Sequence, residues 1–187
     1  MKQKIVQESI LLFDQKGFGS TSIQDIVDAL NVTKGTFYYY FSSKEQLLMD
    51  IHLDYIEDLL NHQEKIMLKQ SSYREKLQDI VYLLIKDIEV RGSEGKVFFR
   101  EMRHLGEKHA EIIREKRNVF RENVELILRE GMKQGDFREG LQAHMLSFAI
   151  LGITNWSYQW YQPAGSVSPK ELTNIYIDMI LNGILPS

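Results

Sequence analysis

The distribution of proline is the strongest constraint on the fold of this chain of 187 residues. Its three prolines stand at positions 163, 169 and 186, so the first 162 residues contain none. Proline breaks helices because it lacks an amide hydrogen and its ring clashes with the preceding turn, so a long proline-free sequence is typical of helical proteins. No stretch shows the sustained apolar–polar alternation of a half-buried strand. The sequence therefore predicts an all-α fold of about nine helices.

Charge and cysteine content exclude several classes of protein. The net charge is −3, which provides no general attraction to nucleic acid or to a membrane surface. Cysteine is absent, which excludes disulfides and thiolate metal sites. The N-terminal segment lacks the unbroken apolar stretch of a signal peptide, and the longest apolar run, residues 145–153, is too short to span a bilayer. We expect a cytoplasmic protein that does not enter the membrane.

The first fifty residues have the pattern of three short helices. Ile5, Leu12 and Phe13 mark the first, which ends at the glycines around Phe18. Thr21 and Ser22 can cap a second helix, and Thr33 can cap a very short third one that runs to Tyr40. Between them stands Asn31, a residue that tolerates the left-handed conformation of a tight turn. Two short helices joined in this way are a helix-turn-helix, and we place this domain at residues 1–48.

The third helix has the residues of a DNA-reading element. Lys34 can contact a phosphate or a guanine, and Thr36 can meet a base edge or a thymine methyl group. Gly35 would let the backbone approach DNA closely, and Tyr39 and Tyr40 offer hydroxyls to phosphates. Up to Asp50 the chain has five lysines and six acidic residues. Specificity must therefore rest on a few placed contacts and on dimerisation.

These residues follow a known signature. Residues 5–51 resemble the N-terminal domain of the tetracycline-repressor (TetR/AcrR) family. Val27, Asn31 and Ser9 depart from its common alanine, glycine and alanine, but each is small or compatible with a turn. The resemblance implies a homodimer that binds a palindromic double-stranded operator. The matching positions are Phe13, Gly17-Phe18, Thr21-Ser22-Ile23, Ile26, Val32, Lys34 to Phe41, Lys44-Glu45 and Leu47-Leu48.

The resemblance also implies which residues contact DNA. Lys44 is expected to touch a phosphate, because it stands where free amide groups at a helix start also attract anions. The expected DNA-binding residues are Thr21, Ser22, Thr33, Lys34, Gly35, Thr36, Tyr38, Tyr39, Tyr40 and Lys44.

The rest of the chain, residues 49–187, is predicted to be a helical domain for effector binding and dimerisation. Its last two helices, one at about 138–161 and one from Pro169 to Gly183, carry more apolar surface than one partner covers. Gly152 and Gly183 would let helices approach closely, and the register of the last helix places Ile180 in the same seam. We therefore expect a two-fold interface built from two helices of each subunit.

A second, narrower resemblance covers about 35 residues from Gly152 onward. This stretch is similar to the C-terminal domain of family members that control fatty-acid and steroid catabolism and respond to acyl-CoA thioesters. Aromatic and methionine side chains of the middle helices suit an elongated apolar ligand. The expected ligand-binding residues are Tyr82, Ile85, Phe98, Phe99, Arg100, Met102, Arg103, Phe120, Val124, Phe148, Leu151, Trp156 and Trp160.

Charge favours one of two effectors. A long acyl-CoA needs cations near its channel, and Arg100 and Arg103 adjoin the apolar lining. The other candidate is an uncharged or cationic drug-like lipophile that would control an efflux gene. A cationic one would need buried carboxylates, but Asp79, Asp87 and Glu89 fall off the apolar stripe. The arginines of residues 114–121, interleaved with glutamates, are expected on a solvated helix face. The interpretation is a repressor released by an acyl-CoA, with a drug-responsive repressor as the alternative.

Proteins of other classes fit less well. Glu101 and His104 have the Glu-x-x-His spacing of di-iron helical bundles, but the chain has no second copy of that pair. No phosphate-binding glycine loop and no nucleophile elbow occurs. A bundle that only binds proteins would not need the segment from Lys34 to Tyr40. We expect no catalytic residue, no metal and no cofactor.

Overall fold

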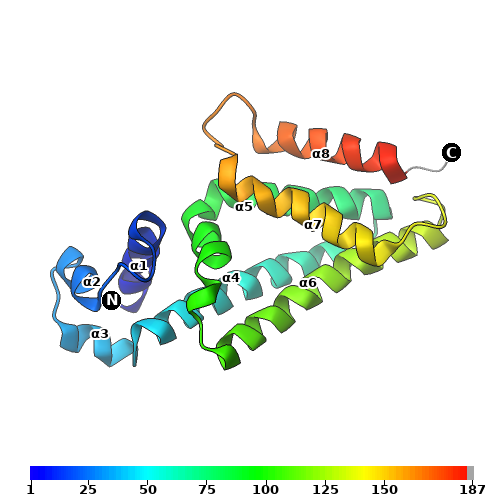
Figure 1. Ribbon diagram of the computed structural model, residues 1–187. Helices are drawn as coiled ribbons and strands as arrows, with labels where there is room; N and C mark the ends of the chain where they lie inside the picture. Colours follow the sequence, from blue (N-terminus) through cyan, green and yellow to red (C-terminus); the bar gives the residue numbers. More distant parts are fainter. Residues whose placement is uncertain (185–187) are drawn as a thin grey trace. The chain divides into compact units, whose positions relative to one another are not determined.

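The computed structural model describes residues 1–184 and the side chains of residues 1–182. The described chain contains eight α-helices and one 3₁₀-helix and no strand, which confirms the all-α prediction. None of the described helices is both long and apolar enough to cross a bilayer. In chain order (Figure 1), the elements are α1 (Lys2–Lys16), α2 (Ile23–Ala29), α3 (Lys34–Tyr40), α4 (Lys44–Met67), α5 (Tyr73–Arg100), η1 (Met102–His104), α6 (Glu107–Lys133), α7 (Ala143–Trp160) and α8 (Pro169–Ile184).

Capping side chains explain where several helices begin. At α2 the Asp25 amide donates to Ser22 Oγ over 3.1 Å, and the Ser22 amide donates to Asp25 Oδ2 over 2.7 Å. Ser168 and Glu171 form the same reciprocal pair at α8, at 3.2 and 2.8 Å. Each pair satisfies amide groups that the first turn of a helix leaves without a partner. The cap at Ser22 confirms what the sequence predicts for the start of α2.

The described chain divides into two compact units. The first unit contains residues 1–57 and 93–115, and the second contains residues 58–92 and the chain from residue 116 onward. Three helices, α4, α5 and α6, therefore have residues in both units. The domain boundary predicted from the sequence, between residues 48 and 49, does not coincide with this division. Local sequence patterns cannot show that residues 93–115 pack with the N-terminal helices.

Each unit has an apolar interior built from one face of each helix. Burying a large apolar side chain stabilises a fold by about 1.5–3 kcal/mol. The most buried side chains of the first unit include Ile5, Phe13, Ile26, Phe37, Leu47 and Phe98, and those of the second include Leu77, Ile80, Val81, Val124 and Ile127. All of these except Leu47 and Phe98 lie on apolar stripes that follow the helical period in the sequence.

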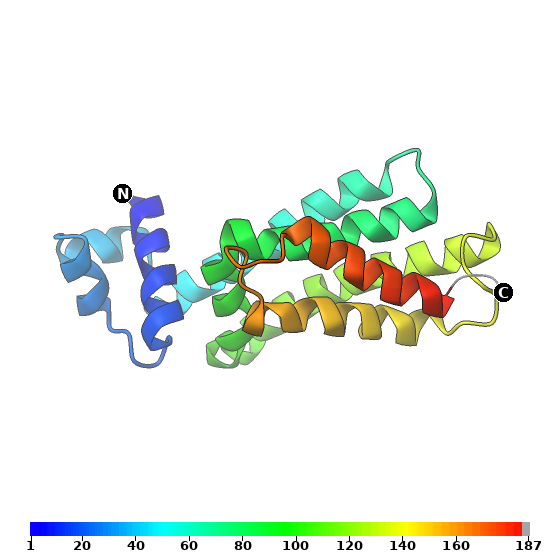
Figure 2. The same cartoon turned by 90° about the horizontal axis from the view of Figure 1, so that it is seen from above.

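One helix of the second half differs from its predicted bounds, and another is bent. Helix α5 continues to Arg100, but Arg91 interrupts it with φ −133° and ψ 35°. Helix α7 begins at Ala143 and not near Arg138. Helices α7 and α8 lie side by side (Figures 1 and 2), joined by the Ser157 Oγ and Tyr176 hydroxyls at 2.8 Å.

The end of α6 is packed tightly against the chain that follows it. Asp136 accepts a hydrogen bond from the Tyr73 amide over 2.8 Å, which joins the start of α5 to this turn. The ring of Phe137 is buried against Gly131, and a methyl group built on Gly131 would clash with that ring and lie 2.9 Å from Tyr73 Cβ. A side chain at this position therefore has no room.

We predict that Gly131→Ala lowers the free energy of unfolding by about 1–3 kcal/mol, the usual cost of overpacking an interior. Gly92→Ala is the control, because a methyl group there meets nothing within 4 Å. Alanine exceeds glycine in helix propensity by up to about 1 kcal/mol, so this control should not lose stability. Urea unfolding of both variants measures the difference, and equal stability would contradict the packing described here.

Candidate nucleic-acid interface and exposed apolar face

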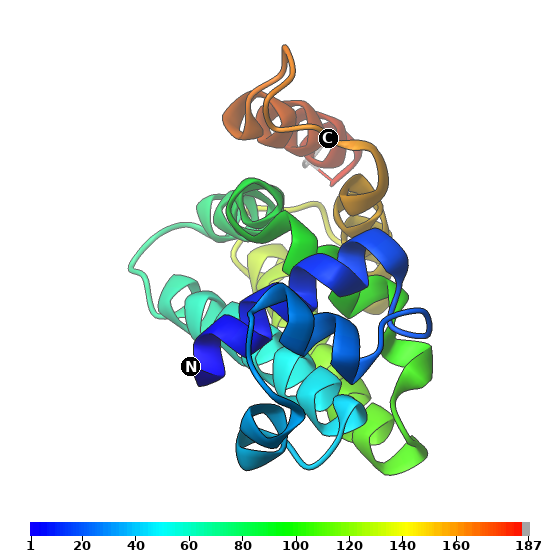
Figure 3. The same ribbon diagram turned by 90° about the vertical axis from the view of Figure 1, so that its left-hand side faces the viewer.

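Helices α2 and α3 form a helix-turn-helix within the first unit (Figure 3, blue). Asn31 takes the left-handed conformation at the turn, with φ 57°, as its sequence position predicts. Thr33 Oγ1 accepts a hydrogen bond from the Thr36 amide over 3.3 Å and so caps α3. Phe37 is fully buried and fixes this short helix to the rest of the unit.

The opposite face of α3 is exposed. Thr33, Lys34 and Gly35 lie at its N-terminal end, where helix amides favour an anion. Tyr38 and Tyr39 are 54% and 81% exposed, although large aromatic side chains are usually at least partly buried. Thr36 and Tyr40 are half-buried beside this surface. These side chains can reach an external partner together, as the sequence predicts.

The fold itself does not require glycine at position 35. A methyl group on Gly35 would make an ordinary contact, 3.5 Å from Thr33 Oγ1, and the residue is not in the left-handed region. Glycine is also a poor helix former. A glycine that the fold does not require indicates that another molecule approaches the backbone closely at this position.

Two expected DNA contacts have structural roles instead. The Thr21 side chain is buried, and its hydroxyl donates to the Gly17 carbonyl over 2.9 Å. The prediction that this side chain contacts DNA is therefore wrong. Lys44 Nζ donates to the carbonyls of Phe18 and Thr21 over 2.6 and 2.5 Å and lies 4.1 Å from the centroid of the Phe18 ring. Burial lowers the pKa of this ammonium. Lys44 thus fastens the α1–α2 turn to α4, while Ser22 is exposed as the cap of α2.

Residues 93–109 are fastened to the N-terminal helices at two places in the first unit. Asp14 of α1 accepts a hydrogen bond from Ser93 Oγ over 2.9 Å, and it pairs with Lys96 and Arg100 at 3.8 and 3.6 Å. At the start of α4, Glu45 Oε1 accepts from the Gly106 amide over 2.8 Å. Arg100, expected beside a ligand, is therefore engaged with α1.

The α1–α2 turn makes a third contact with this segment. The ring of His104 lies 5.2 Å from the ring of Phe18, and His104 pairs with the buried carboxylate of Glu101 at 3.4 Å. Among the described residues no group of three or more His, Asp or Glu side chains could hold a metal ion. The Glu-x-x-His spacing therefore serves packing against the turn.

The expected ligand-binding residues are distributed over both units. In the first unit, Phe98 is buried against Tyr55 and His52, with ring centroids 4.7 and 5.3 Å apart. Phe99 and Met102 are half-buried, and Arg103 is exposed. In the second unit Ile85, Phe120 and Val124 are buried and Leu151 is half-buried. Tyr55 and His52, which pack on Phe98, are not among the residues expected from the sequence.

Four aromatic residues of the expected ligand set are exposed. Phe148, Trp156 and Trp160 of α7 are 53%, 67% and 50% exposed. Tyr82 is also exposed, and it lines a hollow of about 400 Å³ between α4 and α5 of the second unit. The helical period predicts correctly that the three α7 residues share a face, but it does not tell whether that face points inward.

Helices α7 and α8 each expose a row of large apolar side chains, and we call the two rows together the apolar face. Ile175 and Met179 of α8 are 57% and 51% exposed, whereas Ile180 is buried within its own unit. The expectation that Ile180 lies in an intersubunit seam is therefore wrong, because its side chain is buried within the second unit. Its neighbour Met179 is exposed instead. A methyl group on Gly152 would meet nothing within 4 Å, and the surroundings of Gly183 lie outside the described residues. The apolar face consists of Met145, Phe148, Gly152, Trp156, Trp160, Ile175 and Met179.

A buried arginine supports the start of this face. Arg121 of α6 pairs with Glu125 over 2.7 Å, lies 3.2 Å from His144 Nδ1, and has its guanidinium carbon 5.1 Å from the centroid of the Phe148 ring. The Arg121 guanidinium and the His144 ring lower the pKa of the Glu125 carboxyl to about 2. The expectation of a solvated face for residues 114–121 is wrong at Arg121, because α7 covers it.

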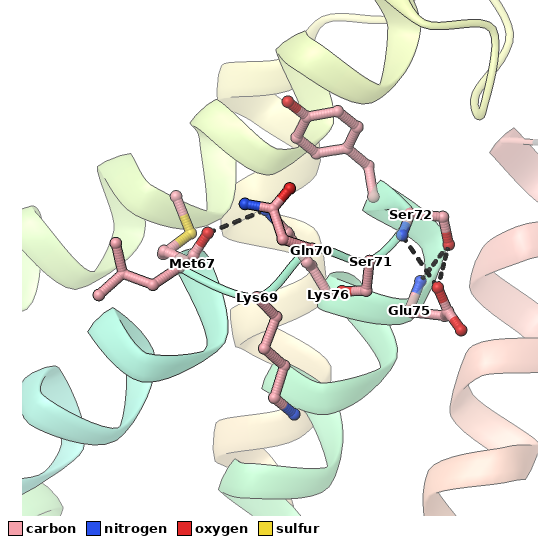
Figure 4. A pocket seen from close by; sticks show the side chains of 9 residues that line it. Met67, Lys69, Gln70, Ser71, Ser72, Glu75 and Lys76 are labelled. Carbon is pink, nitrogen blue, oxygen red and sulfur yellow. Dashed lines mark hydrogen bonds between the residues drawn. The ribbon is translucent and has the colours of Figure 1, made fainter.

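A polar hollow of about 600 Å³ lies at the turn between α4 and α5. Figure 4 shows that its walls are held by two local sets of hydrogen bonds. Lys76 Nζ donates to the Met67 carbonyl over 2.9 Å, while Ser72 and Glu75 form a capping box at the start of α5. These bonds serve the turn itself, and the hollow gathers no set of groups that would recognise a ligand.

Two family models match the chain. Residues 5–51 match the model described as bacterial regulatory proteins, tetR family. Residues 70–184 match the model described as tetracyclin repressor-like, C-terminal domain.

Known proteins resemble the chain over nearly its whole length. The HTH-type transcriptional repressor KstR2 of Rhodococcus jostii (strain RHA1) is 27% identical over 185 residues, which cover 98% of this chain and 90% of that protein. The solved structure of the ketosteroid transcriptional regulator KstR2 of Mycobacterium tuberculosis matches with a TM-score of 0.92 and 21% identity, over 100% of this chain and 95% of its own. The structure of AibR in complex with isovaleryl coenzyme A and operator DNA matches with a TM-score of 0.85 and 22% identity, over 95% and 96%. Both structures share the fold described above.

Proposed function

The chain belongs to the tetracycline-repressor family of bacterial regulatory proteins, and we propose that it is a homodimeric repressor that a long acyl-CoA releases from a palindromic operator. The exposed surface of α3, with Lys34, Gly35, Tyr38 and Tyr39, is the observation that carries DNA binding. Two such helices in a two-fold dimer would enter successive major grooves of a duplex, about 34 Å apart. Since its operator lies on bacterial DNA, we place the protein in the cytoplasm.

The proposed dimer forms through the apolar face of α7 and α8. Monomeric proteins rarely leave several large apolar side chains together in water, and such patches mark interfaces. A two-fold axis would bring the same face of a second copy against it and give a four-helix interface. Gly152, which has open space around it, would then allow close approach of the partner helix.

We predict that Lys34→Ala weakens binding to the operator roughly 10- to 100-fold, because each lost contact to DNA costs about 1–3 kcal/mol. Gly35→Ala should also weaken binding while stabilising the folded protein by up to about 1 kcal/mol, since alanine fits the helix. The probe is a DNA duplex that the wild-type protein selects from a random library, and gel shifts measure the affinity.

Lys108→Ala is the matched control, because Lys108 is an exposed lysine of the same unit that lies outside the helix-turn-helix. Circular dichroism checks that all three variants are folded. If Lys34→Ala and Gly35→Ala hold the selected duplex as tightly as Lys108→Ala does, α3 is not the reading helix.

For the dimer we predict that Met179→Asp weakens self-association about 100-fold or more, because an unpaired carboxylate would be buried at the interface. Ile180→Asp should unfold the chain instead, since Ile180 is buried within its own unit. Sedimentation velocity at micromolar concentrations measures the oligomeric state of each variant.

Leu68→Asp is the control, because Leu68 is 73% exposed in the second unit but lies outside the apolar face. It should remain a dimer. A monomeric wild-type protein, or a Met179→Asp variant as dimeric as Leu68→Asp, would show that the apolar face does not mediate dimerisation.

An anionic effector is supported by an arginine drawn out of water in the second unit. Arg117 is half-buried, and burial lowers the pKa of its guanidinium, whereas the buried Arg121 is already paired with Glu125. Desolvated guanidinium groups favour anions such as phosphate or carboxylate. AibR, which has the same fold, is known with isovaleryl coenzyme A bound. Together with the resemblance from Gly152 onward, these observations support an acyl-CoA.

We predict that one range of acyl chain lengths releases the protein from its selected duplex, whereas free CoA and free fatty acid do not. Arg117→Met should keep its affinity for DNA but need a higher concentration of acyl-CoA, because a cation near the ligand is lost. Arg114→Met is the control, since Arg114 is an exposed arginine of the same helix. Titration of the duplex complex followed by fluorescence anisotropy measures the release.

A lipophilic cation is the alternative effector, and one observation favours it. Asp87, expected outside the interior, is buried in the second unit. Its charge is already matched by Arg91, with Arg91 Nε 3.3 Å from Asp87 Oδ1, so a cation would have to displace that partner. Release of DNA by lipophilic cations but by no thioester, or equal release by free CoA, would reject the acyl-CoA proposal.

A further inference from the structure

The hollow between α4 and α5 that Tyr82 lines, which we call the α4–α5 hollow, lies apart from the surfaces used so far. Its volume is about 400 Å³, and its lining comes from residues 58–91 alone, so it belongs entirely to the second unit. Neither α3, nor the apolar face, nor Arg117 contributes to this lining. Cavities of this size hold small organic molecules.

Apolar side chains from both helices line the α4–α5 hollow. Ile66 of α4 is buried, and Leu83 of α5 is half-buried. Tyr82 and Val90 also line the hollow and remain 40% and 67% exposed. A flat aromatic group could stack on the Tyr82 ring, which adds to the stabilisation gained by covering apolar surface. The hollow therefore offers an unfilled apolar surface to the body of a ligand.

Every acidic side chain of this lining already has a cationic partner. Arg91 pairs with Asp58 at 3.2 Å and with Asp87 at 3.3 Å. Asp79 pairs with Lys69 at 2.6 Å. A cationic ligand would have to displace one of these partners and would gain little net attraction. The α4–α5 hollow therefore does not select cations.

One lysine of the lining remains available to an anion. Lys86 pairs with Glu89, which does not line the hollow. Lys65 is exposed and has no acidic partner among the residues that the structure describes. The two ion pairs that join α4 to α5 fix the register of these antiparallel helices, so Lys65 lies opposite Tyr82 and Leu83. A single ammonium beside an apolar surface suits one negative charge on an apolar body, whereas a dianion would keep one charge unmatched.

We propose that the α4–α5 hollow is a binding site for aromatic carboxylates. The ring of the ligand lies against Tyr82 and Leu83, and its carboxylate accepts a hydrogen bond from Lys65 Nζ. This site uses neither the DNA-reading helix, nor the apolar face, nor the arginine proposed to bind the effector. The proposal therefore goes beyond the proposed function and does not depend on it.

Naphthalene-2-carboxylate is the probe, and the amide chemical shifts of the isotope-labelled protein report where it binds and how tightly. We expect saturable shifts within residues 58–69 and 79–91, with a Kd of about 1 mM or below for a ligand of this size. Naphthalen-2-ylmethylammonium carries the same ring with the opposite charge. It should bind at these residues at least about 5-fold more weakly, because the hollow has no unmatched carboxylate.

Lys65→Met should weaken binding of the carboxylate about 3- to 5-fold, because it keeps most of the apolar stem but removes one solvent-exposed ion pair. Tyr82→Ala should weaken it about 10-fold, because the stacking surface is lost. Lys170→Met is the matched control and should bind as the parent does. Lys170 is also an exposed lysine of the second unit without an acidic partner among the described residues, but it lies outside the hollow.

Three results would each overturn this proposal: no shifts within residues 58–69 and 79–91, equal affinity of these residues for the ammonium compound, or equal affinity of Lys65→Met and Lys170→Met for the carboxylate. The measurements need neither DNA nor acyl-CoA. Their failure would therefore leave the proposed function standing, and a failure to bind an operator would leave this site standing.

Discussion

The ion pairs and hydrogen bond around Asp14 are the interaction on which the organisation of this protein depends. Ser93, Lys96 and Arg100 all reach this carboxylate of α1 from the second half of α5. Because of these contacts, residues 93–115 form one compact unit with the DNA-reading helices and not with the helices that surround them in sequence. Residues 93–115 and α3 therefore belong to the same compact unit.

The two units expose surfaces of different kinds, one polar and one apolar. The first exposes lysine, glycine and tyrosine on a short capped helix, where a charged and polar partner can be read at close range. The second exposes tryptophan, phenylalanine and methionine on α7 and α8, where only another apolar surface gives stable contact. The proposed two-fold dimer would use both surfaces.

Sequence patterns predict what is local in this protein. The helical class, the turn at Asn31, the caps at Ser22, Thr33 and Ser168, and the shared face of α7 all follow from neighbouring residues. The same patterns cannot tell which apolar stripe faces inward, and so Trp156 and Trp160 were expected in a pocket and Ile180 at an interface. They also miss Asp87 and Arg121, because burial of a charge depends on partners such as Tyr158 and His144 that are distant in sequence.

Native mass spectrometry of the complex with a selected DNA duplex, before and after addition of an acyl-CoA, tests whether this chain is a dimeric repressor that a thioester releases. We expect two chains on one duplex, and after addition a dimer that carries the thioester together with free duplex. A single chain on the duplex, or a complex that binds the thioester and retains its DNA, would contradict it.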